Sequence, residues 1–281
     1  MSLYSCCSSS SSSRQLPSAV TQLRGGGGGG YGRPPWDHDD LPFFLQPGRG
    51  KELLAHLEAL PPVIQALVVV NVIIFAGWQV VPSTFMTSHF SESKINMSKR
   101  KVWTLLSCAF SHVSLSHLLA NMAVLTTFGA AVADKLRPKL FLGVVLVSAV
   151  FASAVSALLR PYALQFRSKQ RREAEESRVM LGFSGVNAAL LFLYAVHHPW
   201  SDLSVADLPP MPARRAVQAL MAFDVGGLLL GLTCLPTVVS HSTHVGGYLA
   251  AYLIQLVLCN TPFGRRVATR RQRAALCTSI F

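Results

Sequence analysis

Six long apolar stretches, separated by charged, proline-containing or glycine-rich segments, occupy the chain between residues 62 and 259. Each is close to the twenty residues that an α-helix needs to cross the hydrocarbon core of a bilayer. We predict membrane-spanning helices over Pro62–Val81, His112–Ala133, Leu140–Leu159, Val179–His198, Ala216–Leu235 and His241–Cys259. The pattern therefore predicts an all-α, polytopic membrane protein with a six-helix bundle.

The stretches divide the chain into three regions. Residues 1–60 form an N-terminal tail with a juxtamembrane linker, residues 61–260 the membrane domain, and residues 261–281 a basic C-terminal tail. The loop over residues 82–111 is partly apolar, so we expect it to lie in the membrane surface and to contain an interfacial helix. The charged loop over residues 160–178 is expected to be a solvated helix or hairpin.

The N-terminal tail has the composition of an organelle transit peptide. Residues 1–36 contain a serine run, a glycine run and three arginines but no acidic residue, and they lack the apolar core of a secretory signal. An ordinary flexible tail is the alternative reading. A short basic amphipathic helix over Arg14–Arg24 favours a mitochondrial inner membrane, with a plastid membrane as the alternative.

Composition limits the classes of function. The chain is 51% hydrophobic and 14% charged, which is typical of a membrane protein. Its net charge of +12 comes from lysines and arginines in the tails and between the apolar stretches, so it does not indicate nucleic-acid binding. More of these cations lie on the side of the two tails, which places both termini in the matrix, stroma or cytosol. The six cysteines show no metal-type spacing, and we predict no disulfide framework, metal site or redox role.

Ser184 is the first candidate for chemistry, because it stands in a Gly-Phe-Ser-Gly turn at the start of an apolar stretch. Gly182 permits an unusual backbone at the helix entry, and Gly185 leaves room for a neighbouring helix. Small-residue packing alone would explain this motif equally well. A serine hydroxyl becomes a good nucleophile only when a base accepts its proton.

His244 is the candidate base. It lies three residues before Gly247 on the face that also carries Ala251, a pair of small residues that allows close helix packing. If that face packs on the helix beginning at Ser184, the imidazole meets the hydroxyl. The alternative is a histidine that bonds to backbone or water at the membrane interface.

His117 and Asn121 are four residues apart and so share one helical face. Both can donate hydrogen bonds to an oxyanion, although a bond between helices is the plainer reading. A rival hypothesis makes His112, His117, His241 and His244 metal ligands. It is disfavoured because no acidic residue or HExxH motif accompanies them.

In this order, the segments HVSLSHLLAN, GFSG and HVGGYLAAY together resemble the rhomboid intramembrane serine proteases. The resemblance covers about residues 62–259 and neither tail. It implies a catalytic dyad of Ser184 and His244 without an aspartate. It further implies that His117, Asn121 and the Ser184 backbone N–H stabilise the tetrahedral intermediate, with no cofactor or metal.

Two departures from the family pattern bear on this site. The first loop has Trp103-Thr104 where many members have Trp-Arg, and Ala188 stands where many have a tyrosine that stacks on the histidine. Another group must therefore orient His244. Asp224, the only carboxylate within a predicted span, is expected to line the cavity or to be structural.

The main functional hypothesis is an endopeptidase that cleaves membrane-spanning protein substrates inside the bilayer. The alternatives are a catalytically silent rhomboid-like protein that binds and routes membrane clients, and a small transporter. The transporter is disfavoured because the two halves of the chain show no duplication.

Overall fold

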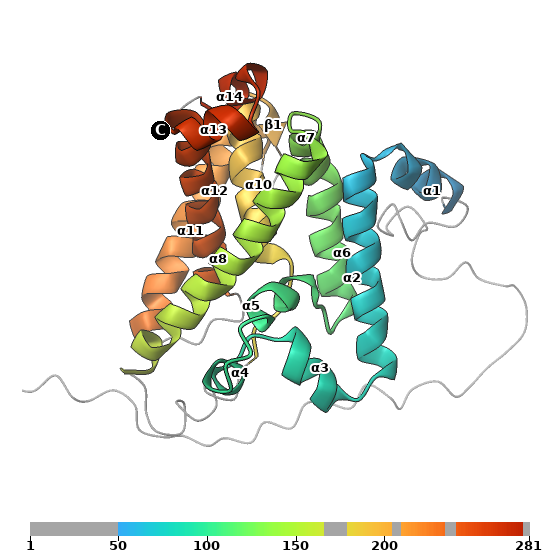
Figure 1. Ribbon diagram of the computed structural model, residues 1–281, viewed down its shortest axis with the longest axis vertical. Coiled ribbons are helices and arrows are strands. Elements are labelled where there is room, and N and C mark those ends of the chain that lie inside the picture. Colours follow the sequence, from blue (N-terminus) through green and yellow to red (C-terminus); the bar gives the residue numbers. More distant parts are fainter. Residues whose placement is uncertain (1–49, 166–178, 204–208, 234–239, 278–281) are drawn as a thin grey trace, which may run out of the picture. The chain divides into compact units, whose positions relative to one another are not determined.

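The computed structural model describes residues 50–165, 179–203, 209–233 and 240–277 (Figure 1). The chain divides into two units, Met1–Gly50 and Lys51–Phe281, and only the second is described below. The predicted transit peptide, the Arg14–Arg24 helix and most of the charged third loop lie outside the described residues.

Helices occur at all six predicted positions. They are α2 (Pro62–Val80), a continuous stretch of α6, the π-helical turn η4 and α7 (Leu115–Val124, Leu125–Gly129 and Ala130–Ala133), α8 (Pro138–Gln165), α10 (Ser184–His197), α11 (Ala213–Thr233) and α12 (His241–Asn260). Among the described residues, four helices are long and apolar enough to cross a membrane: Pro62–Val80, Leu115–Ala133, Pro138–Arg160 and His241–Asn260. The protein is thus mostly helical and polytopic, as the apolar pattern predicts.

α10 is the central helix of the bundle. Most of its 14 residues are buried, whereas α2 exposes apolar side chains such as Ile73 and Val80, as a lipid-facing helix does. α10 begins five residues later than predicted. Gly182, with a φ of +123°, ends the extended segment before it, and the backbone N–H of Gly182 donates to Cys108 O at 2.9 Å. Hydropathy does not separate such an extended apolar segment from a helix, so the predicted start at Val179 is wrong.

The first loop is built from short helices, and its placement in the membrane surface stays a prediction. They are α3 (Ser83–Phe90), α4 (Lys94–Ser98), α5 (Thr104–Ser107) and the 3-10 turn η3 (Cys108–Phe110), which gather near one end of the bundle (Figure 1). Glu92 connects this loop to two distant elements. Its backbone pairs with Met180, and its buried carboxylate forms an ion pair with Arg160 near the end of α8. Burial raises the pKa of Glu92, and the Arg160 charge opposes that shift.

The C-terminal segment is folded rather than a free tail. It forms α13 (Pro262–Val267) and α14 (Arg270–Leu276), and the backbone carbonyl of Leu276 accepts a hydrogen bond from Gln255 of α12. A disulfide joins Cys259 to Cys277. The prediction of no disulfide is therefore wrong. Spacing could not reveal it, because these cysteines meet only when α14 folds back along α12. At the same end, β1 (Asp202–Leu203) pairs with β2 (Met211–Pro212) between α10 and α11.

Candidate active site

A cavity of about 640 Å³ opens at the N-terminal end of α10. Its wall comes from α6, the segment before α10, α10 itself, α11 and the start of α12. The polar groups that line it are Ser114, His117, Asn121, Ser184, Asn187, Asp224, Ser240, His244 and Tyr248. The structure thus gathers Ser184, His244 and the pair His117 and Asn121, which come from three distant parts of the sequence, around one cavity.

Ser184 is the first residue of α10 and stands on the cavity wall. Its position depends on Gly182, because a Cβ atom at that residue would lie 2.6 Å from the His117 ring. The positive φ of Gly182 and this close approach together require glycine there. Among the described residues, no hydrogen bond engages the Ser184 hydroxyl, so it is available to a group that enters the cavity.

Close contact between α10 and α12 brings His244 to the same cavity. A Cβ atom at Gly247 would lie 2.0 Å from the Gly185 carbonyl oxygen, and one at Gly185 would lie 2.8 Å from Thr243 Cγ2. Only glycine allows two backbones to approach this closely. The small-residue face of α12 therefore packs on the start of α10, as the sequence predicts.

Asp224 orients His244. The Asp224 Oδ1 atom lies 3.0 Å from His244 Nδ1, and Asp224 Oδ2 accepts a hydrogen bond from the Tyr248 hydroxyl at 3.2 Å. A carboxylate acceptor at Nδ1 favours the tautomer that carries its proton there. Nε2 of His244 is then the nitrogen that can accept a proton. The dyad implied by the resemblance stays a prediction, and the structure adds that a carboxylate contacts its histidine.

His241 shares the same carboxylate oxygen, with its Nδ1 atom 2.8 Å from Asp224 Oδ1. The two histidines differ in exposure, since the side chain of His241 is 6% exposed and that of His244 is 21% exposed. Only His244 lines the cavity. A Cβ atom at Gly227 would lie 2.4 Å from the His241 ring, so α11 closes over this histidine. His241 is therefore a packed partner of Asp224.

The three hydrogen bonds to Asp224 also explain how a carboxylate persists in an apolar helix. An ionised group is costly in such surroundings unless hydrogen bonds replace its water shell. Asp224 is 3% exposed and receives bonds from His241, His244 and Tyr248. Because these bonds meet on one side chain, Asp224 fixes α11 against α12 as well as orienting His244.

His117 and Asn121 lie across the cavity on α6. The Asn121 side-chain amide donates to the His117 carbonyl at 2.9 Å, and Asn121 Oδ1 accepts a bond from Asn187 Nδ2 at 2.9 Å. Asn187, which sequence reasoning missed, thereby ties α10 to α6. These bonds hold the Asn121 amide with one N–H left for a group in the cavity.

His112 supports the site from the first loop. Its Nε2 atom accepts a hydrogen bond from the backbone N–H of Phe183 at 3.3 Å, and its ring lies 4.9 Å from that of His117. His112 thus positions the residue before Ser184. Within the described part of the chain, no group of histidines, cysteines and carboxylates is arranged to hold a metal ion.

Asp224 lines the cavity, as the sequence analysis expects, whereas its contact with His244 and the part played by Tyr248 were missed. A usable signal exists for Tyr248, because it lies four residues after His244 and so shares its face of α12. Asp224 was visible as a carboxylate within an apolar span, but the register of α11 against α12 decides whether it meets a histidine.

Comparison with known proteins points to one family. A model described as the rhomboid domain matches residues 99–261. RHOMBOID-like protein 12, mitochondrial, from Arabidopsis thaliana is 30% identical over 188 residues, which cover 66% of this chain and 55% of that protein. Presenilin-associated rhomboid-like protein A, mitochondrial, from Danio rerio is 27% identical over 189 residues, which cover 66% of this chain and 45% of that protein.

A plastid relative also matches. Rhomboid-like protein 16, chloroplastic, from Arabidopsis thaliana is 28% identical over 130 residues, which cover 44% of this chain and 40% of that protein. The chain spans about half the length of the curated relatives it matches.

Proposed function

Because the chain belongs to the rhomboid family, we propose that it is an intramembrane serine endopeptidase that hydrolyses peptide bonds of membrane-spanning proteins. The observation that carries the proposal is the contact of Asp224 with His244 on the wall of the cavity that also contains Ser184. A bundle that only bound clients would have no need of an oriented imidazole in the same cavity as an unengaged serine.

The proposed reaction begins when a substrate segment enters the cavity. His244 Nε2 takes the proton of the Ser184 hydroxyl as its oxygen attacks the scissile carbonyl, and the imidazolium later protonates the leaving amine. Asp224 accepts the Nδ1–H of His244 and stabilises the charge on the ring, as the third member of a serine-hydrolase triad does. Water then enters and hydrolyses the acyl-enzyme, with His244 as the base.

The tetrahedral intermediate carries a negative oxygen that needs hydrogen-bond donors. His117, the free N–H of Asn121 and the backbone N–H of Ser184 are the proposed donors. In other serine hydrolases the loss of one such donor lowers kcat by about 100- to 1,000-fold.

Asp224 orients the His244 imidazole in place of the tyrosine that many family members have. Ala188 occupies that position and is buried in α10, so no ring from α10 stacks on His244 at that position. Orientation of the imidazole therefore depends on α11, and movement of α11 would change the alignment of the base as well as access to the cavity.

The mitochondrial relatives and the acid-free tail support a mitochondrial membrane, and the tail composition favours the inner membrane. The cavity wall includes Ser114, Val179–Leu181 and Ser240, which follow the first, third and fifth loops directly or end them, so we propose that it opens on the side of these loops.

The test is cleavage of a single-span substrate by purified protein in liposomes. Ser184→Ala is expected to abolish cleavage while the thermal unfolding temperature stays unchanged. Ser148→Ala is the matched control, because this buried serine of α8 has no hydrogen-bond partner among the described residues and does not line the cavity. Cleavage by the Ser184→Ala protein at the wild-type rate would contradict the proposal and favour the client-binding alternative.

A further inference from the structure

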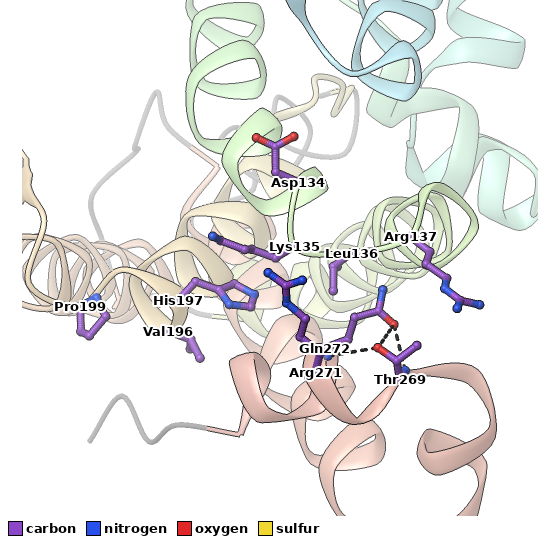
Figure 2. Close-up of a pocket in the computed structure, with 10 residues that line it drawn as sticks. All are labelled: Asp134, Lys135, Leu136, Arg137, Val196, His197, Pro199, Thr269, Arg271 and Gln272. Carbon is purple, nitrogen blue, oxygen red and sulfur yellow. Dashed lines mark hydrogen bonds between the residues drawn. The ribbon is translucent and has the colours of Figure 1, made fainter.

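A second polar cavity, of about 810 Å³, lies at the end of α10 opposite to Ser184. It is formed where the connection between α7 and α8, the last turn of α10 and the start of α14 meet (Figure 2). The residues that line it are Asp134, Lys135, Leu136, Arg137, Val196, His197, Pro199, Thr269, Arg271 and Gln272. The mechanism proposed above uses none of them.

The lining carries more positive than negative charge. Lys135, Arg137 and Arg271 contribute three cations, whereas Asp134 is the only acid among the lining residues. In Figure 2 the nitrogen-bearing ends of Lys135, His197 and Arg271 gather on one side, and the Asp134 carboxylate points away from them. Within the described residues, none of the three cations forms an ion pair. Lys135 and Arg271 converge without ionic partners in the described part of the chain, which favours an anion between them, whereas the Arg137 side chain points away from this pair (Figure 2).

Two uncharged side chains, those of His197 and Gln272, also line the cavity. His197 Nε2 is shielded from solvent and has no hydrogen-bond partner among the described residues. Gln272, in contrast, is engaged, because its Oε1 atom accepts a bond from the Thr269 backbone N–H at 2.9 Å. The capping box of Thr269 and Gln272 fixes the first turn of α14, and with it the backbone of Arg271.

The position of the cavity indicates the chemistry of the anion. Its lining begins directly after the span that ends at Ala133 and directly before the span that begins at Pro138. This is the depth at which phosphate groups of lipids lie, and basic pockets between spans bind such headgroups. We propose that this cavity binds a phosphate-bearing anion, either the headgroup of an anionic phospholipid or a soluble phosphate compound.

Other basic residues at the same end provide the comparison. Arg265 and Arg266 of α13 are exposed cations near the end of α12, but neither lines the cavity. Such flanking cations are ordinary at the ends of spans and interact with the membrane surface as a whole. If the cavity is a specific site, removing the charges of Lys135 and Arg271 should weaken anion binding more than removing those of Arg265 and Arg266.

The experiment measures phospholipid retention by native mass spectrometry, using full-length protein from phosphatidylcholine nanodiscs with and without phosphatidylglycerol. The Lys135→Gln/Arg271→Gln protein is compared with wild type and with the matched Arg265→Gln/Arg266→Gln protein. We expect about a thirtyfold loss of retained phosphatidylglycerol for the first variant, since each cation near an anionic headgroup contributes about fivefold. The matched control is expected to stay within about twofold of wild type. A parallel arm adds inorganic phosphate to the phosphatidylcholine nanodiscs and follows the thermal unfolding temperature.

Phosphatidylglycerol retention that depends on Lys135 and Arg271 supports a lipid headgroup. A phosphate-induced rise in unfolding temperature with the same dependence supports a soluble phosphate compound. Equal retention by all three proteins, together with no such rise, would overturn the proposal, as would equal losses in the two variants. If the double variant does not fold, the single Arg271→Gln protein is expected to show about a fivefold loss. None of these measurements depends on protease activity.

Discussion

The two polar cavities at the ends of α10 differ in how their charged groups are satisfied. At the Ser184 end, Asp224 receives hydrogen bonds from His241, His244 and Tyr248, so the charge is compensated inside the protein. At the His197 end, Lys135, Arg137 and Arg271 have no ionic partner among the described residues. We therefore propose chemistry at the first cavity and binding of an anionic ligand at the second.

The largest expected effect comes from removing the charge that orients His244. Asp224→Asn is expected to lower kcat by roughly 100- to 10,000-fold with little change in KM, because the imidazole loses its preferred tautomer and the stabilisation of its charged form. Steady-state kinetics with a single-span substrate measures both parameters. Asp202→Asn, at an exposed carboxylate of β1, is the matched control. A rise in KM with kcat unchanged would indicate a role in substrate binding instead.

The next largest effect is expected when the close packing between α10 and α12 is disturbed. Gly247→Ala places a methyl group against the Gly185 carbonyl, so it is expected to destabilise the fold by about 1–3 kcal/mol and to slow cleavage. Gly226→Ala is the control, because a Cβ atom there meets nothing within 4 Å. Unfolding in mixed micelles gives the free energies. Equal stabilities for the two variants would show that α10 and α12 are not in backbone contact.

The last prediction compares access to the two cavities without changing activity, and it concerns Cys108, which lines a narrow space behind Ser184. Burial raises the pKa of its thiol to about 12, so the reactive thiolate is scarce until the pH approaches that value. At mildly alkaline pH we expect alkylation to be about a thousandfold slower than at a Lys135→Cys thiol in the other cavity. Peptide mapping after iodoacetamide treatment measures both rates. Similar rates would mean that the Ser184 end of the bundle is as open as the basic end.

Much of the fold could be predicted from the apolar stretches, because a helix that crosses the bilayer needs about twenty consecutive, mainly apolar residues. The positions of all six helices follow from that pattern. The start of α10 does not, because a glycine with positive φ separates it from an extended segment of equal hydropathy. The Cys259–Cys277 disulfide also escaped prediction, since it depends on how α14 returns to α12.

The parts of the candidate site that depend on residue spacing within one helix could be predicted, whereas the parts that depend on how two helices pack could not. The face of α12 that carries His244 and Gly247 could be identified from spacing, and the structure packs it on α10. The contact between Asp224 and His244 could not, because it depends on the rotation of α11 about its axis. The basic cavity is equally hidden, since its lining comes from three segments that only the fold brings together.

The central claim is that Ser184 is a nucleophile activated by His244, and labelling with a fluorophosphonate probe tests it most directly. The account predicts covalent labelling of wild-type protein at Ser184, its absence in Ser184→Ala and His244→Gln proteins, and wild-type labelling of the Ser148→Ala control. Undiminished labelling of the His244→Gln protein, or no labelling of folded wild-type protein, would contradict it.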